Sequence, residues 1–523
     1  MNATRPSRFR ALVWIVLCSA TVAPFVVAAL PPLYDYYHWV FEGDLFASLA
    51  FGQDTARDRA IAGAYGIRAL PVPNSAATVV LGLLDLALPP LVAGRVFAAS
   101  CALAFALGFA CLARAIQRRP TVVELLGFPW AFGYFFYKGY LSYVFSVALA
   151  FFALGALMRT TDGGRRPPGG RVVVGMGIVS VLLFASHLVG WALLLGGAAF
   201  LALGLWPTSR RDAVRLVAPF APSLVLPVWY ALGSRGGKAS VYYGSWGDKL
   251  RSLLEPWFLY VRTDPIPPAF PTPALTLAGI TILAALLLAG RGENPERRSV
   301  RALVRLSAVL AALALALPFN NFMGMNRPDG RILFPALLIA TATIPYRRLT
   351  GRGAFLAGGV IVAGLALHSF EYARASRYLE RVASALEESV PRDEPGLSVA
   401  VILPGPESGC GRAGSLHLGR SDTLRWFGLV PVLEADQVRV SLMATSLVEK
   451  YFDHEDPHDL KLVALESGRI PDLVLASRGW ADRVAHAEIF GCPGDVERAA
   501  SALALYFEKV ASGPGFAVLE TVD

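Results

Sequence analysis

The sequence predicts an all-α bundle of about eleven transmembrane helices, followed at the C-terminal end by a small α/β domain outside the cytoplasm. Of the 523 residues, 55% are hydrophobic and only 17% are charged, against about 25% charged residues in a typical soluble domain. The mean hydropathy is +0.50. The apolar residues also stand in long blocks, which a lipid bilayer can bury. Composition and blocks together indicate an integral membrane protein.

The first apolar block covers residues 11–30 and follows three arginines, Arg5, Arg8 and Arg10. A cleaved signal peptide is the alternative, but its apolar region usually spans about 7–15 residues, and this block is longer. Pro31 and Pro32 then end the helix, since proline cannot continue it. We therefore expect a retained helix with its N-terminus in the cytoplasm.

Arginine clusters recur between the later apolar blocks. The blocks lie near residues 92–114, 122–137, 140–158, 172–186, 188–206, 214–232, 272–290, 302–318, 331–346 and 353–369. The clusters lie within residues 114–119, 159–171, 210–215, 291–305 and 347–352. If all of them face the cytoplasm, the chain obeys the positive-inside rule throughout. Because the number of predicted spans is odd and the N-terminus is cytoplasmic, everything after about residue 370 is predicted to lie on the outer side.

The predicted membrane domain, residues 1–370, has two long outer loops, at about 31–75 and 233–271. A third, short outer loop covers residues 320–331. The apolar segment 76–89 is too short to span and contains Asp85, so we expect an interfacial helix there. Because the cytoplasmic loops are short and rich in arginine, any chemistry is expected on the outer face.

The tail, residues 371–523, has the pattern of a small α/β domain. Apolar runs predict strands at 397–403, 473–477 and 516–521, and helical spacing predicts helices at 372–389 and 495–508, the second capped by Asp495. Gly405–Gly409 lacks the spacing of a phosphate-binding loop, which argues against a nucleotide-binding role.

The charge distribution argues against a nucleic-acid-binding protein, and the cysteine positions argue against a Cys/His metal site. The net charge is +9, but the arginines lie between apolar blocks, with no basic stripe among stacking aromatics, so no nucleic-acid partner is expected. Cys18, Cys101 and Cys111 lie in apolar helices and are expected to be packing residues. Cys410 and Cys492 lie in the outer tail, where a disulfide between them is predicted. The sequence has no metal-ligand spacing of Cys and His.

The first outer loop carries the main catalytic candidates. Asp35, His38 and Glu42 would share one helical face at i, i+3 and i+7, with Asp44 nearby. The aromatic residues around them are also typical of an anchoring belt at the membrane interface. A belt does not explain the acids, however, and a carboxylate among aromatics has the environment of a general base.

An acid just beyond the first transmembrane helix, in a long outer loop, resembles the GT-C superfamily of membrane glycosyltransferases. The segment that carries the resemblance is Pro31-Pro32-Leu33-Tyr34-Asp35-Tyr36-Tyr37-His38. It is similar to the Pro-Pro-x-x-Asp-x-x-x-His opening of some bacterial members, with one residue fewer between Asp and His. The tail's Pro471-Asp472-Leu473-Val474-Leu475 is similar to a strand common in their C-terminal domains. The motifs are short, although the architecture matches over the whole chain.

The resemblance implies a polyprenyl-phosphate-linked sugar donor, a glycan, lipid or protein acceptor, and a place in a bacterial inner or plasma membrane. It implies catalysis by Asp35, with Glu42 or Asp44 as further acids. Asp35 is not followed by the acidic pair of some subfamilies, so no cofactor is certain and a divalent metal stays open.

Cations near the outer helix ends are the candidates for binding the donor phosphate. Arg327 and Arg331 flank Asp329 and could hold a phosphate through paired hydrogen bonds. Anchoring to lipid headgroups with an Arg–Asp salt bridge is the alternative. Lys138, His187 and His38 are further substrate-binding candidates, although helix-end lysines also snorkel. A lipid or polysaccharide flippase is the alternative function, but we find no internal repeat and no charges at mid-membrane depth.

Overall fold

The computed structural model describes most of the membrane part of the chain and several separate segments of the tail. The described residues are 8–254, 279, 297–387, 397–402, 438–439, 448–450, 486–490 and 493–522, apart from 34, 53–54, 69–71, 162–167, 208, 234–244, 319–326, 347–350, 505 and 514–515. The predicted span 272–290, apart from Gly279, the predicted strand 473–477 and the two tail cysteines lie outside them.

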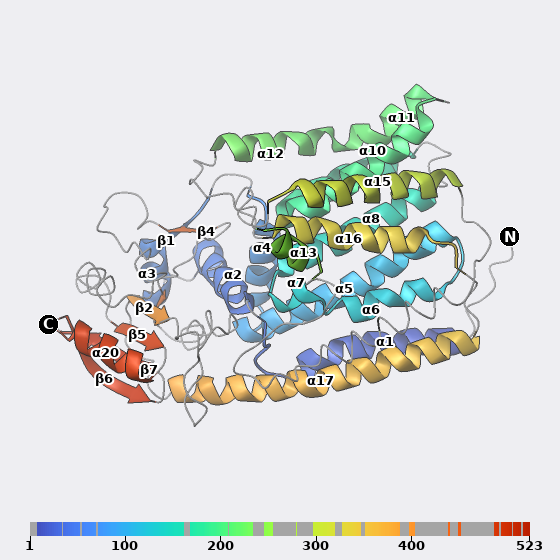
Figure 1. Cartoon of the computed structure of the whole chain (residues 1–523). Helices are drawn as coiled ribbons and strands as arrows, with labels where there is room; N and C mark the ends of the chain where they lie inside the picture. Colours follow the sequence, from blue (N-terminus) through green and yellow to red (C-terminus); the bar gives the residue numbers. More distant parts are fainter. Residues whose placement is uncertain are drawn as a thin grey trace.

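The described part of the membrane domain is a bundle of helices whose long axes run roughly parallel (Figure 1). Its N-terminal half contains α1 (Arg8–Val27), α2 (Tyr36–Phe51), α3 (Ala56–Ala64), α4 (Ser75–Asp85), α5 (Pro90–Gln117), α6 (Gly127–Trp130), α7 (Tyr134–Tyr137) and α8 (Leu141–Thr160). Its C-terminal half contains α9 (Gly170–Ser186), α10 (Leu188–Leu205), α11 (Arg210–Val217), α12 (Ala221–Gly233), α13 (Trp246–Leu254), α15 (Arg297–Ala316), α16 (Pro328–Thr343) and α17 (Gly351–Glu387).

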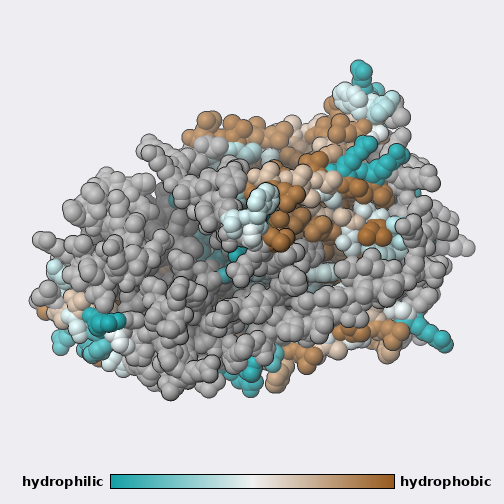
Figure 2. All heavy atoms as spheres, viewed as in Figure 1, coloured by the Kyte–Doolittle hydropathy of each residue, from teal (hydrophilic) through white to brown (hydrophobic). Residues whose placement is uncertain are grey.

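Six of the described helical segments are long and apolar enough to cross a membrane, and three shorter apolar ones accompany them. Apolar side chains are exposed along α12 and α17, where Figure 2 shows brown surface at opposite edges of the molecule. Examples on α12 are Val225 and Leu232, and on α17 Leu356 and Phe370. Exposed apolar flanks of this kind are what lipid-facing helices present, and the chain is an integral membrane protein.

Small residues bring α5 and α8 together at the centre of the bundle. A Cβ on Gly108 would lie 2.6 Å from the carbonyl oxygen of Ala148, so only glycine permits this approach. Phe105 packs against Phe151 and, on the other side, against Phe334 of α16, with ring centroids 5.8 and 5.9 Å away. The first turns of α8 and α16, which both carry residues of the candidate site, are joined directly by the Tyr143 hydroxyl, which donates to the Arg331 carbonyl.

The described arginines of the clusters at the ends of α5 and α8 lie at the same end of the bundle, as the positive-inside pattern requires. Arg119 at the end of α5 donates to the carbonyl of Tyr346 beyond α16, with an N–O distance of 2.8 Å. Arg159 at the end of α8 donates to the carbonyl of Cys111 at 3.3 Å. The N-terminus lies at this end, and the C-terminal sheet lies at the opposite end (Figure 1). Which end faces the cytoplasm stays a prediction.

Two helix boundaries differ from the sequence prediction. The runs 353–369 and 372–389 belong to the single helix α17, 37 residues long. The polar sequence after Phe370 contains no helix-breaking residue, so the helix continues through it. The drop in hydropathy marks only where α17 leaves the apolar zone. By contrast, the predicted break at residues 186–187 is confirmed, since His187 separates α9 from α10 with extended backbone angles.

The C-terminal region contains a five-stranded mixed sheet in the order β3-β2-β5-β7-β6. Its strands are β2 (Leu397–Ile402), β3 (Val438–Arg439), β5 (His486–Phe490), β6 (Phe507–Gly513) and β7 (Phe516–Thr521). Strand β2 is parallel to β3 and β5, whereas β7 is antiparallel to β5 and β6. The predicted strands 397–403 and 516–521 are confirmed. The predicted helix 495–508 is wrong at its end, because α20 (Pro493–Leu503) stops and Phe507 and Glu508 begin β6.

A two-stranded sheet joins the first outer loop to the tail. Strand β1 (Tyr65–Ile67) pairs antiparallel with β4 (Val448–Lys450), with Tyr65 opposite Lys450. The polar part of α17 also contacts this region, because the Ser376 hydroxyl accepts from the backbone N–H of Leu30 at 2.9 Å. The loop that follows α1 is therefore held from two sides.

Candidate active site

Asp35 stands at the start of α2, fixed by backbone contacts with the turn between α7 and α8. Its N–H donates to the carbonyl of Lys138 at 3.2 Å, and its carbonyl accepts from Trp39 at 3.2 Å. The Trp39 indole N–H donates to the carbonyl of Gly139 at 3.0 Å. Gly139 has a φ of +70°, and a Cβ there would lie 2.4 Å from the Asp35 nitrogen. Although Asp35 occupies the N-cap position, its carboxylate makes no capping hydrogen bond to the helix.

Arg331 lies in the first turn of α16 among aromatic rings. Its side chain is almost fully buried, and its Cζ lies 4.0 Å from the centre of the Tyr140 ring. The Tyr143 ring centre is 5.8 Å away, and the Tyr143 hydroxyl donates to the Arg331 carbonyl at 2.8 Å. A guanidinium over desolvated aromatic faces is held in place without losing its charge.

A second aromatic ring carries two more cations. The Cζ of Arg327 lies 5.0 Å from the centre of the Tyr134 ring, and the Nζ of Lys138 lies 6.0 Å from it. Arg327 has a left-handed φ of 51° as it enters α16, a conformation uncommon for residues other than glycine. The side chains of α7, α16 and the α7–α8 turn therefore bring positive charge to one place.

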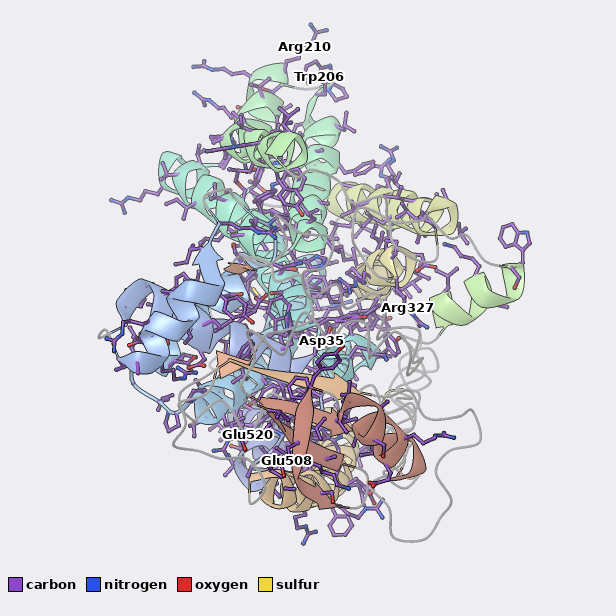
Figure 3. The ribbon with its side chains drawn as sticks, turned by 90° about the vertical axis from the view of Figure 1, so that its left-hand side faces the viewer. Asp35, Trp206, Arg210, Arg327, Glu508 and Glu520 are labelled. Atoms are coloured by element: carbon purple, nitrogen blue, oxygen red, sulfur yellow. The ribbon has the colours of Figure 1, made fainter. Side chains whose placement is uncertain are left out.

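Tyr140 links Asp35 with these arginines, because the charges of all three residues act on its phenol. Burial raises the pKa of the Tyr140 phenol, the Arg331 guanidinium lowers it, the Asp35 carboxylate raises it, and Arg327 lowers it. All three charges thus act on one hydroxyl. In Figure 3, viewed from the end that carries the C-terminal sheet, Asp35 and Arg327 both project onto the middle of the molecule.

His187 completes this group from the α9–α10 break. Its Nδ1 accepts from the backbone N–H of Val189 at 3.1 Å, and its Nε2 lies 3.0 Å from Nη1 of Arg331. Burial lowers the pKa of His187 well below its ordinary value, and the Arg331 charge lowers it further. The imidazole is therefore neutral at physiological pH.

Asp329, between the two arginines in sequence, is fully buried and forms an ion pair with Lys249 of α13. The distance from its Oδ2 to the lysine Nζ is 3.0 Å, and its Oδ1 accepts from the Gly330 N–H at 2.7 Å. This pair lies beside the site and orders the start of α16.

The other acids of the first loop hold helices together. Glu42 is fully buried, accepts from the Thr78 hydroxyl of α4 at 2.7 Å, and lies 3.5 Å from the Nε2 of His38. The i, i+4 contact confirms that His38 and Glu42 share a helical face. Asp44 forms an ion pair with Arg57 of α3. The structure thus joins Asp35 to the cation group, whereas Glu42 and Asp44 join α2 to α4 and α3.

Several residues of the site were not identified from the sequence. Tyr134, Tyr140 and Tyr143 surround the cations, and their signal was the dense run of aromatics on both sides of Lys138. The only sequence feature that sets Lys249 apart is that lysines are rare in this chain, whereas arginines are common. Within the described residues, no group of three or more His, Cys, Asp or Glu is arranged to hold a metal ion.

Comparison with known proteins gives a distant likeness. No family model matches the chain, and no curated protein gives a significant match. Among solved structures, the chain is similar to crystal structures of ArnT from Cupriavidus metallidurans. In the apo state the identity is 15% and the TM-score 0.41, and bound to undecaprenyl phosphate they are 13% and 0.44. Both alignments cover 98% of each chain.

Proposed function

We propose that this protein is a membrane glycosyltransferase that moves a sugar from a polyprenyl-phosphate-linked donor to an acceptor at the outer face of the membrane. One observation carries the proposal: Asp35 bonds through its N–H to the Lys138 carbonyl, and its charge acts on Tyr140 together with those of Arg327 and Arg331. Lys138 and Arg327 share the Tyr134 ring, and His187 contacts Arg331. These residues come from separate segments of the chain and meet at the end of the bundle opposite the arginine clusters.

The cation group suits a lipid-linked phosphate. The residues lie just before or within the first turns of α8, α10 and α16, and α8 and α10 are long and apolar enough to cross a membrane. A polyprenyl phosphate places its charged head at such a depth and its apolar tail along the bundle. Guanidinium groups bind phosphate through paired hydrogen bonds, and burial against Tyr140 strengthens each interaction by excluding water.

Asp35 suits the role of general base. Its carboxylate takes the proton of an acceptor hydroxyl while that oxygen attacks the anomeric carbon of the sugar, opposite the phosphate. The bond between the anomeric carbon and the phosphate oxygen breaks, and the polyprenyl phosphate leaves on the cation group. The new glycosidic bond has inverted configuration, because the attack comes from the opposite face.

We assign Glu42 and Asp44 to stability, since Thr78 and Arg57 occupy their carboxylates. In the same proposal, residues 1–370 form the membrane domain of an inner-membrane enzyme and residues 371–523 form an outer domain. The acceptor is a glycan, a lipid or a protein.

Binding and turnover of a lipid phosphate test this proposal. Purified protein in nanodiscs should bind undecaprenyl phosphate, and Arg331→Ala should weaken that binding by about 10-fold or more, because charge-assisted bonds are lost. Arg210→Ala is the matched control: Arg210 also stacks on an aromatic ring, Trp206, at 5.7 Å, but lies far from Asp35 (Figure 3). Wild type that binds no lipid phosphate, or that moves the lipid across a bilayer without sugar transfer, would contradict the proposal.

A further inference from the structure

Helix α13 is attached to the bundle by an unusual face. Among its described side chains, Lys249 and Leu253 are buried one turn apart, whereas Trp246 and Leu250 are exposed. One of the two buried anchors is therefore a charged residue. Lysine is almost never fully buried unless it is paired, so its partner identifies what this helix does.

The partner is the start of α16. The Nζ of Lys249 lies 3.0 Å from the Oδ2 of Asp329, and it also donates to the carbonyl of Leu317, beyond the end of α15. Both charged side chains are buried, at 8% and 0% exposure. A single ammonium group thus contacts both sides of the α15–α16 connection.

Asp329 is two residues from Arg327 and two from Arg331. A buried carboxylate without a counter-charge is costly, so it recruits whatever cation can reach it. Without Lys249, the cations closest in sequence to that carboxylate are the two arginines. A guanidinium drawn to Asp329 would lose its place over Tyr134 or Tyr140 and its charge would no longer be available to a phosphate.

We propose that Lys249 is a positioning residue of the donor site: it neutralises Asp329 and thereby keeps Arg327 and Arg331 available to the donor phosphate. This inference rests on the proposed function. It assigns a role in donor binding to the second outer loop, of which no described residue belongs to the group around Asp35. It also gives Asp329 a role as the acid that Lys249 must satisfy, not as a ligand of the substrate.

Four variants of the full-length protein test the inference. Lys249→Met removes the ammonium group paired with Asp329, Lys249→Arg keeps the charge, and the double variant Lys249→Met/Asp329→Asn removes both charges. Lys509→Met is the control, because Lys509 forms an ion pair with Glu497 at 3.0 Å on the exposed surface of the tail. For each variant, the Kd for undecaprenyl phosphate, the KM and kcat of sugar transfer, and the Tm are measured in nanodiscs.

Lys249→Met is expected to raise the Kd and KM by about 10-fold or more, with kcat within about threefold of wild type. Lys249→Arg and the double variant should restore the Kd to within about threefold, even if the double variant has a lower Tm. If Lys249→Met does not fold, a Kd of the double variant raised about 10-fold above that of Lys249→Arg would overturn the role of Lys249. An unchanged Kd in folded Lys249→Met, or a double variant as weak as the single one, would overturn the role of Lys249. Wild type that binds no undecaprenyl phosphate would overturn the proposed function and this role with it.

Discussion

The Nε2 of His187 lies 3.0 Å from the Nη1 of Arg331, while the Nδ1 of the same ring accepts a hydrogen bond from the Val189 N–H. A neutral imidazole has only one acceptor nitrogen, so the two donors compete for it. An anion that accepts from both Arg331 and an Nε2–H tautomer of His187 would end this competition. We therefore expect His187→Phe to raise the Kd for undecaprenyl phosphate by about 10-fold. The same Kd in a folded variant would remove His187 from the phosphate site.

Asp35→Asn should affect turnover and not donor binding. Asparagine keeps the shape of the side chain but cannot accept the hydroxyl proton, and losing a general base costs about 10²–10⁴-fold in rate. The measurement is kcat with purified protein, beside the Kd for undecaprenyl phosphate, which should stay within about threefold. If the folded variant keeps full transfer activity, the base must be sought again among the acids of the first loop.

Glu42 should matter for stability alone. Thr78→Val deletes the hydroxyl that donates to Glu42 at 2.7 Å, which leaves a buried carboxylate oxygen with one partner fewer. The expected loss is about 1–3 kcal/mol of unfolding free energy, measured as a lower Tm, with unchanged kcat for the folded fraction. A large fall in kcat at unchanged Tm would return Glu42 to the catalytic candidates.

Asp85 at the end of α4 predicts a pH-dependent stability. Burial raises its pKa to about 8, and the nearby Asp44 charge adds to the shift. Between the ordinary value of 3.8 and about 8, the folded protein holds a proton that the unfolded chain has lost. Stability is therefore fully present below pH 4 and falls as the pH rises toward 8, by at most about 1.4 kcal/mol per pH unit. Asp85→Asn should flatten the dependence of Tm on pH, and an identical slope would contradict the assignment.

Reporter fusions test the orientation of the bundle. Fusions after Arg166 and Arg298 should report the cytoplasm, and fusions after Trp246 and Asp393 should report the outer side, because the arginine clusters set the topology. A cytoplasmic signal after Asp393 would place the tail on the wrong side of the membrane for the proposed reaction.

The sequence predicts well what depends on local patterns. The break at His187, the helix at Ser75–Asp85 and the strand at Leu397–Ile402 follow from hydropathy, proline and spacing over a few residues. It also directs attention to Asp35, because that residue is the first acid after the first apolar block. Local patterns cannot predict pairings across the chain. Arg57 as the partner of Asp44, and Lys249 as the partner of Asp329, depend on packing that places distant segments together.

The pairing of β1 with β4 has a consequence for biosynthesis. Tyr65 stands opposite Lys450, so most of the chain must be made between the two strands. At about 5–20 residues per second, β1 leaves the ribosome roughly 20–80 s before its partner exists. During that interval the first outer loop has an exposed strand edge, and such edges recruit other chains. The loop that carries Asp35 can therefore reach its paired arrangement only after β4 has been made.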